Sequence, residues 1–173
     1  MQENRLDATD IRRTLGRMAH QILEENQGAN DIVVIGILNR GFPVAKRLAF
    51  AMTQIEGVTI PTGKLDIRKY RDDNPGESED ATEIPFSVQG KHVILVDEVI
   101  QTGRTIRAAL DAIIRHGRPS NVQLAVLVDR GGRELPIQPN YIGKELDVSD
   151  SERIEVHFAE VDGEDSVVVH SGV

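Results

Sequence analysis

The chain has 173 residues, 39% of them hydrophobic and 28% charged, a composition typical of a soluble globular protein and not of a disordered or fibrous one. Its formal net charge of −8 argues against a general attraction to nucleic acid, and 3% aromatic residues are too few for an extended base-stacking surface. Because the sequence shows no cysteine, no signal peptide and no apolar run long enough to cross a bilayer, we expect a cytoplasmic protein without disulfides.

The first expected element is a helix that follows Thr9, a residue type favoured at the N-cap position. Its apolar stripe follows helical spacing: Ile11, Leu15, Met18 and Ile22. A second face carries three basic or titratable side chains: Arg13, Arg17 and His20. By spacing alone, this second face is an ordinary solvated helix surface.

Apolar and β-branched runs predict strands, and the continuous ones predict strands covered on both faces, as in a parallel sheet. Strands are expected at residues 31–37, 57–67 (one or two pieces), 92–97, 122–129, 153–158 and 166–169. Helices are expected to open near Pro43 and after Thr105, and Gly117 is expected at the C′ position of the second. Strands that alternate with helices predict an α/β domain with a mainly parallel sheet, which we expect to span residues 1–173.

One segment between the strands is different in kind. Residues 70–86, YRDDNPGESEDATEIPF, are polar and acidic and contain proline and glycine. Long loops inside compact domains are usually functional or disordered. We therefore expect a long exposed loop or a flexible hairpin here.

Three loops at the expected carboxyl ends of strands carry polar residues, and ligands of open α/β sheets bind at this edge. The loops are LNRG at 38–41, DEVIQTGRT at 97–105 and DRGGREL at 129–135. Gly103, Arg104 and Thr105 before a helix offer N–H groups to a phosphate, although a capped helix start has the same pattern. Asp97 and Glu98 beside them suit the hydroxyls of a sugar phosphate, the alternative being a solvated pair of charges.

The stretch VILVDEVIQTGRT at 93–105 is neither a P-loop nor a Rossmann fingerprint, and no spacing of His, Asp and Glu predicts a metal cage. It resembles the phosphoribosyl pyrophosphate (PRPP) motif of type I phosphoribosyltransferases. Further segments resemble the PyrR family, over residues 12–161: RMAHQILEEN, IGILNRGFPVAKRLA, LDIRKYRDD, GRPSNVQLAVLVDRGGRELPI and YIGK. The resemblance implies a type I phosphoribosyltransferase fold, with a mainly parallel central sheet flanked by helices, a flexible loop and a small hood.

The PyrR family regulates pyrimidine operons by UMP-dependent binding of attenuator mRNA, and it also converts uracil and PRPP to UMP and diphosphate. The resemblance therefore implies uracil, PRPP, UMP, UTP and a pyrimidine operon leader mRNA as partners, and no membrane. It implies Mg²⁺ bound with PRPP as the cofactor. It also implies a homodimer or a higher homo-oligomer.

The resemblance assigns a role to each matching residue. The substrate-binding residues would be Asn39, Arg40 and Gly41 (pyrophosphate), Tyr70 and Arg71 (flexible loop), Asp97 and Glu98 (ribose hydroxyls), Thr102, Gly103, Arg104 and Thr105 (5′-phosphate), and Asp129 and Arg130 (uracil). The catalytic candidates, which would stabilise charge in the transition state, are Arg40, Arg71, Asp97 and Glu98. The residues expected to contact RNA are Arg13, Arg17, His20 and Lys144.

Several positions depart from the family pattern. The second acid of the PRPP motif is Glu98 where aspartate is usual, and a carboxylate misplaced by about 1 Å can cost on the order of a hundredfold in rate. Four further positions, most of them on the expected RNA surface, lack the usual side chain: Gly16, Glu25, Gly132 and Gln138. Two alternatives stay open: a uracil phosphoribosyltransferase without RNA recognition, favoured by Glu25 and Gln138, and a nucleotide sensor with little catalysis, favoured by Glu98.

Overall fold

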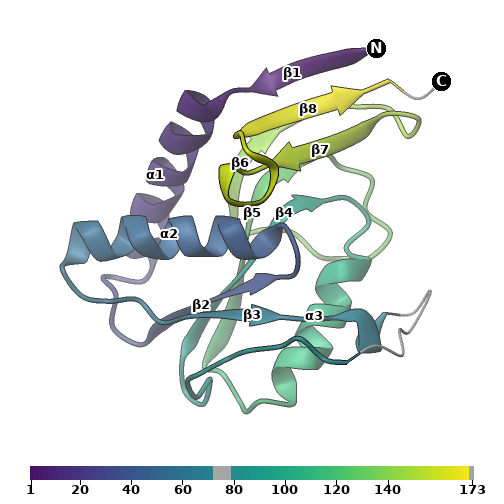
Figure 1. Ribbon diagram of the computed structural model, residues 1–173. Coiled ribbons are helices and arrows are strands. Elements are labelled where there is room, and N and C mark those ends of the chain that lie inside the picture. Colours follow the sequence, from purple (N-terminus) through teal and green to yellow (C-terminus); the bar gives the residue numbers. More distant parts are fainter. Residues whose placement is uncertain (72–78, 172–173) are drawn as a thin grey trace.

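The computed structural model describes residues 1–71 and 79–171, which form two β-sheets (Figure 1). The larger sheet is parallel, in the order β3-β2-β4-β5-β6. Its strands are β2 (Ile32–Ile37), β3 (Thr62–Leu65), β4 (His92–Ile100), β5 (Asn121–Asp129) and β6 (Tyr141–Glu145). The helices around it are α1 (Ala8–Glu25), α2 (Gly41–Glu56) and α3 (Arg104–Ile114), with a 3₁₀ turn at Arg68–Tyr70.

The smaller sheet is antiparallel, in the order β1-β8-β7. It consists of β1 (Gln2–Leu6), β7 (Arg153–His157) and β8 (Ser166–His170), and the short helix α4 (Ala159–Asp162) connects the last two strands. We call these four elements the hood. Together, the two sheets confirm the predicted type I phosphoribosyltransferase architecture, a parallel α/β sheet with a small hood.

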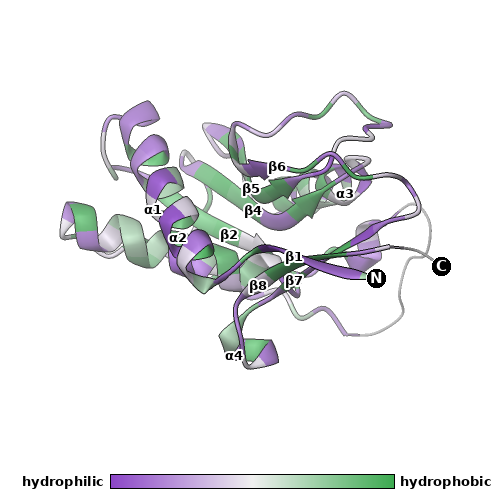
Figure 2. Cartoon of the chain, turned by 90° about the horizontal axis from the view of Figure 1, so that it is seen from above, coloured by the Kyte–Doolittle hydropathy of each residue, from purple (hydrophilic) through white to green (hydrophobic). Residues whose placement is uncertain are grey.

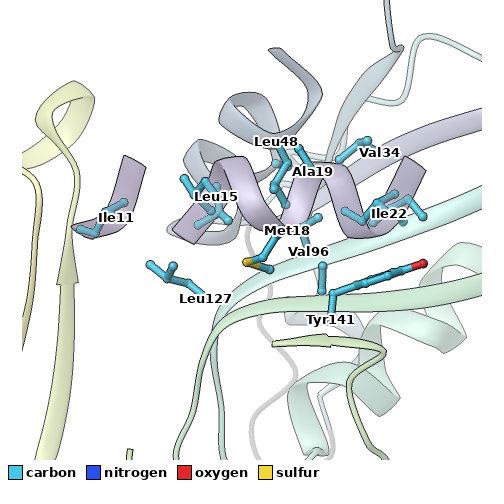
Figure 3. Close-up of a cluster of buried hydrophobic side chains, with 14 of the residues drawn as sticks. Ile11, Leu15, Met18, Ala19, Ile22, Val34, Leu48, Val96, Leu127 and Tyr141 are labelled. Carbon is cyan, nitrogen blue, oxygen red and sulfur yellow. The ribbon is translucent and has the colours of Figure 1, made fainter. Parts of the chain in front are cut away.

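The buried middle parts of the central strands are apolar because helices cover both faces of the larger sheet. In Figure 1, α1 and α2 lie on one face and α3 on the other. Neighbouring residues of β4 point to opposite faces, so Ile94 and Val96 pack in the cluster with α1 and α2, whereas Leu95 packs with α3. Figure 3 shows Met18 of α1 in the first cluster together with Val96. Each large aliphatic side chain buried in this way contributes roughly 1.5–3 kcal/mol by leaving water.

Hydropathy follows the same division. Figure 2 shows the central strands mainly in green, whereas α1 carries both colours along its length. Six residues of α1 are buried, and they include the predicted stripe: Ile11, Leu15, Met18, Ala19, Ile22 and Leu23. Within residues 1–71 and 79–171, none of the helices has the combination of length and apolarity needed to traverse a membrane.

A charged contact fixes the hood to the rest of the molecule. The guanidinium of Arg47, on α2, bonds both oxygens of Asp165 at 2.7 and 2.9 Å and also pairs with Glu160. The ring of Phe158, at the start of α4, lies 4.9 Å from the same guanidinium carbon. These bonds raise the pKa of Arg47 and lower the pKa of Asp165 and of Glu160. Since α2 begins beside the larger sheet's carboxyl edge, these contacts of Arg47, which we call the Arg47 clamp, hold the hood over that edge.

Most of the predicted elements are confirmed; the differences are shifted boundaries and two strands that the sequence did not predict. The N-cap of α1 is Asp7 and not Thr9, because Asp7 and Asp10 exchange backbone N–H bonds in a capping box at 2.8 and 3.0 Å. The helix α3 ends at Ile114 with Arg115 as its C-cap, which places Gly117 one position beyond C′. Strands β1 and β6 were not predicted. Of the expected loop at 70–86, residues 72–78 lie outside the described part, and Glu83 forms an isolated bridge with Lys64.

Candidate active site

The carboxyl edge of the larger sheet and the hood enclose a cavity of about 790 Å³. Six residues predicted from the sequence line it: Asn39, Arg40, Arg71, Asp97, Glu98 and Thr105. The other lining residues are Ile37, Leu38, Asp66, Ile67, Arg68, Ala81, Val99 and 154–157. The parallel arrangement of β2, β3 and β4 brings these segments together, because all three strands end at the same edge.

A second cavity of about 460 Å³ adjoins the first. The two share five lining residues: Asp97, Val99, Thr105, Ile154 and Glu155. The second cavity is also lined by Gln101, Thr102 and Gly103 from the turn after β4, and by Arg130 after β5. The two cavities are therefore halves of one site, with Asp97 at the boundary between them.

The sequence predicted a strand that ends at residue 97 with the two acids at its exit, but β4 continues to Ile100. Asp97 and Glu98 therefore lie within the last four residues of the strand, and they differ in environment. Asp97 is only 4% exposed, and its Oδ1 accepts the backbone N–H of Glu98 at 2.9 Å, whereas Glu98 is half-buried. Burial, followed by the negative charge of Glu98, raises the pKa of Asp97 well above its ordinary value. A cation or several hydroxyl donors bound here would favour the ionised form of Asp97. The site therefore presents acids that are suited to a polyhydroxyl or cationic ligand.

The start of α2 approaches β4 at Gly41. A Cβ on this residue would lie 2.6 Å from the carbonyl oxygen of Val96 and 3.0 Å from Asp97 Cα. Gly41 is buried and does not line either cavity, so its absent side chain is what lets the loop after β2 lie against Asp97. Earlier in the same loop, the peptide bond between Leu38 and Asn39 is cis.

The turn before α3 is built as the sequence predicts. Gly103 is the N-cap residue, with a φ of 91°, and its carbonyl accepts the first helical bond from the N–H of Arg107. The N–H groups of the first turn precede the helical ladder and point out of its N-terminus. One of them, on Arg104, donates to Thr102 Oγ1 at 3.2 Å. The turn thus provides the amide groups of an anion site beside the two acids.

Three arginines line the larger cavity; Arg68 is paired with Asp66, and the other two, Arg40 and Arg71, come from different segments. Arg40 follows β2, and its Nη2 donates to Asp162 of the hood at 2.9 Å. Arg71, which is exposed, follows the 3₁₀ turn at Arg68–Tyr70. Both are suited to an anionic group placed between the loop after β2 and the segment after β3.

The cavity wall contains two acids that were not predicted, Asp66 and Glu155. Asp66 follows directly on β3, is 6% exposed, and accepts bonds from Arg68 and from the backbone N–H of Ala81. The hydrogen bonds from Arg68 lower the pKa of Asp66. Its position after the last residue of a strand, at the same edge as Asp97, is the signal that could have revealed it.

Two other predicted residues, Tyr70 and Asp129, line neither cavity. The carbonyl of Tyr70 accepts a bond from Arg107 Nη2 at 2.8 Å, and its ring lies 5.6 Å from the guanidinium carbon of Arg115. Asp129 forms two bonds with Arg133, at 2.7 and 2.9 Å. Burial raises the pKa of Asp129, but the bonds and charge of Arg133 together with the backbone N–H of Gly131 outweigh that effect and leave the pKa lowered.

Two arginines of the predicted site are engaged with other parts of the chain. The side chain of Arg104 pairs with Glu134 at 2.8 Å on the surface, and Arg104 lines neither of the two cavities. Arg130 does line the smaller cavity, while its Nη2 donates to the carbonyls of Ser149 and Glu152, each at 3.0 Å. Arg130 therefore ties the segment before β7 to the end of β5.

The predicted RNA residues lie on a different surface, made by α1 and β6. Arg13, His20 and Lys144 are exposed there. Arg17 is also exposed, but its Nη2 donates to the carbonyl of Gly143 at 2.6 Å and its Nη1 to Gln21 at 3.2 Å. Arg17 thus satisfies a carbonyl of the edge strand β6, a structural role that helical spacing alone does not reveal.

Comparisons with known proteins agree on one family. A family model described as the phosphoribosyl transferase domain matches residues 1–160. The curated "Bifunctional protein PyrR" of Pelotomaculum thermopropionicum is 53% identical over 168 residues, which is 95% of this chain and 93% of that protein. Proteins of the same name from Chloroflexus aurantiacus and Deinococcus deserti are 51% and 52% identical, covering 96% and 94% of this chain and 94% and 91% of their own length.

Solved structures give the same fold at lower sequence identity. The hypoxanthine phosphoribosyltransferase of Trypanosoma cruzi superposes with a TM-score of 0.76 at 18% identity, covering 99% of this chain and 97% of its own. The purine phosphoribosyltransferase from Pyrococcus horikoshii superposes with a TM-score of 0.63 at 21% identity, covering 82% and 86%. These likenesses carry the fold and not the substrate.

Proposed function

Because the chain belongs to the PyrR family of phosphoribosyltransferases, we propose that it converts uracil and PRPP to UMP and diphosphate and regulates a pyrimidine operon by UMP-dependent binding of leader mRNA. The enzymatic part of this proposal rests on one observation: the acids Asp97 and Glu98, the amide-rich turn before α3, and the arginines Arg40 and Arg71 surround the same site. The ribose then lies at Asp97 and Glu98, with the 5′-phosphate at the turn from Thr102 to Thr105.

In this reaction, the bond between ribose C1 and the diphosphate oxygen breaks while a bond forms between C1 and N1 of uracil, and the N1 proton passes to water. Positive charge develops on the sugar ring, and the carboxylates of Asp97 and Glu98 stabilise it. Arg40 and Arg71 stabilise the negative charge that accumulates on the departing diphosphate. The uracil enters from the side of the smaller cavity, near Arg130.

The site also suits a magnesium ion that arrives with PRPP. Mg²⁺ usually keeps several waters and is bound by one or two carboxylates together with substrate phosphates. Asp97 and Glu98 provide such carboxylates, and a cation beside them would relieve the repulsion that contributes to the raised pKa of Asp97. When bound, the ion supplies positive charge to the diphosphate leaving group.

Two substitutions test the enzymatic proposal. We expect Asp97→Asn and Thr105→Val each to abolish PRPP-dependent UMP formation without lowering the melting temperature. The matched controls are Asp150→Asn and Thr59→Val, which make the same changes at exposed positions outside both cavities. Wild-type turnover in both site variants would remove this site from the mechanism.

The regulatory half rests on family membership and on the exposed basic residues of the α1–β6 surface. Its test is a filter-binding assay with the leader RNA of the protein's own pyrimidine operon, with and without UMP. We expect Glu25→Arg and Gln138→Arg, both at exposed positions, to tighten binding and to steepen its salt dependence by nearly one unit each. Weak binding that is indifferent to RNA sequence would favour the enzyme without RNA recognition. Tight UMP binding with negligible turnover would favour the sensor.

We also expect self-association into a dimer or higher oligomer, measurable by sedimentation.

A further inference from the structure

One arginine of the larger cavity is already paired with a carboxylate of the hood. Arg40 Nη2 donates to Asp162 Oδ1 at 2.9 Å, and the two side chains are 34% and 17% exposed. Asp162 is the last residue of α4. The pair therefore joins the loop after β2, where we place the diphosphate, to the hood above it.

The carboxylate of Asp162 is held in place by its own turn. Its second oxygen, Oδ2, accepts the backbone N–H of Phe158 at 2.9 Å, and His157 Nδ1 lies 3.8 Å from the same oxygen. These contacts fix the carboxylate without help from Arg40. Oδ1 is thus presented to the position of the Arg40 guanidinium whether or not the pair is formed.

A separate clamp keeps the hood in position when this pair opens. Arg47 binds Asp165 and Glu160 from α2, and none of these three residues contributes to the bond between Arg40 and Asp162. The strand pairs β7–β8 and β8–β1 likewise include neither Arg40 nor Asp162. Arg40 can consequently leave Asp162 while the hood stays docked.

We propose that the carboxylate of Asp162 competes with the diphosphate group for the guanidinium of Arg40. Asp162 is thus a positioning residue, and this role rests on the phosphoribosyl transfer proposed above. A diphosphate offers several charged oxygens, and guanidinium–phosphate pairs are bidentate, so the diphosphate displaces a single carboxylate bond. When the diphosphate leaves, Asp162 takes Arg40 back. The anionic product is therefore held less tightly than by an arginine without an internal partner.

The test is the affinity of inorganic diphosphate with Mg²⁺, measured by calorimetry on the full chain. Asp162→Asn removes the charge but keeps an oxygen for the Phe158 N–H, and we expect diphosphate to bind roughly two- to fivefold more tightly, the scale of a partly exposed ion pair. Glu164→Gln makes the same charge change at an exposed position of the hood and should leave the affinity unchanged. Asp162→Ser, which also removes the charge, should reproduce the gain.

A double variant shows whether the gain passes through Arg40. Arg40→Gln should weaken diphosphate binding, and adding Asp162→Asn to it should bring no gain. If Arg40→Gln weakens binding but Asp162→Asn and Asp162→Ser leave it unchanged or weaker, the competitor role is refuted while the proposed reaction stands. If neither Arg40→Gln nor the double variant differs from the wild type, the diphosphate position in the proposed function is itself wrong.

Discussion

Replacing Gly41 with alanine tests whether the loop after β2 depends on its close approach to β4. The added Cβ would lie 2.6 Å from the Val96 carbonyl oxygen, about 0.8 Å inside the 3.4 Å at which ordinary contact begins. The Val96 oxygen and the Asp97 Cα, the two atoms nearest to the added Cβ, both belong to the backbone, so the start of α2 must move away from Asp97. Overpacking of this kind costs about 1–3 kcal/mol, which in a chain of this size lowers the melting temperature by roughly 2–12 °C.

The same displacement separates Arg40 from the acids, and a misplacement of this size can cost on the order of a hundredfold in kcat/KM for PRPP. The control is Gly16→Ala on α1, where a Cβ meets nothing within 4 Å. There we expect a gain of up to about 1 kcal/mol and unchanged turnover, because alanine is the better helix residue. Differential scanning calorimetry and a UMP-formation assay measure both effects. Gly41→Ala with wild-type stability and turnover would refute the close-approach argument.

Three further predictions concern single side chains. We expect Glu98→Asp to raise kcat/KM for PRPP, because it restores the shorter carboxylate; an unchanged or lower value would mean that the loop has already adjusted to glutamate. Arg17→Ala should weaken leader-RNA binding, leave uracil turnover intact and also lower the melting temperature, since its guanidinium bonds the Gly143 carbonyl, whereas Arg13→Ala should affect RNA affinity alone. Because folding raises the pKa of Asp97, this residue contributes stability below its unfolded pKa, and that contribution is lost as the pH rises through its folded pKa. The melting temperature of Asp97→Asn should therefore exceed that of the wild type by a larger margin at pH 8 than at pH 4. An equal difference at both pH values would contradict the buried-acid account.

The sequence was informative wherever a local pattern determines the structure. The apolar runs that became β2, β4 and β5 are buried on both faces, and that burial is what makes such runs continuous. The loops after them carried the site because parallel strands all end at the same edge. The turn at Gly103 was also predictable, because the residue before α3 has a positive φ, which glycine adopts more easily than other residues.

What the sequence did not reveal depends on contacts between distant segments. Strand β1 is exposed at all but its last residue, so it has no apolar alternation to detect, and it forms only by pairing with β8. The ion pair between Arg40 and Asp162 and the bond from Arg17 to Gly143 each join residues more than 120 positions apart. No helical or strand period encodes such pairs.

The pairing of β1 with β8 has a consequence for the order of folding. Gln2 lies opposite His170, so the first hood strand has no partner until the last one has been synthesised. Contacts of such long sequence separation carry a large loop-closure entropy and form late. The parallel sheet, whose neighbouring strands are closer in sequence, can assemble while the ribosome is still producing the hood. The nascent chain would then contain the folded parallel sheet before the hood has formed, and Asp97 and Glu98 would remain open to water until β8 has been synthesised.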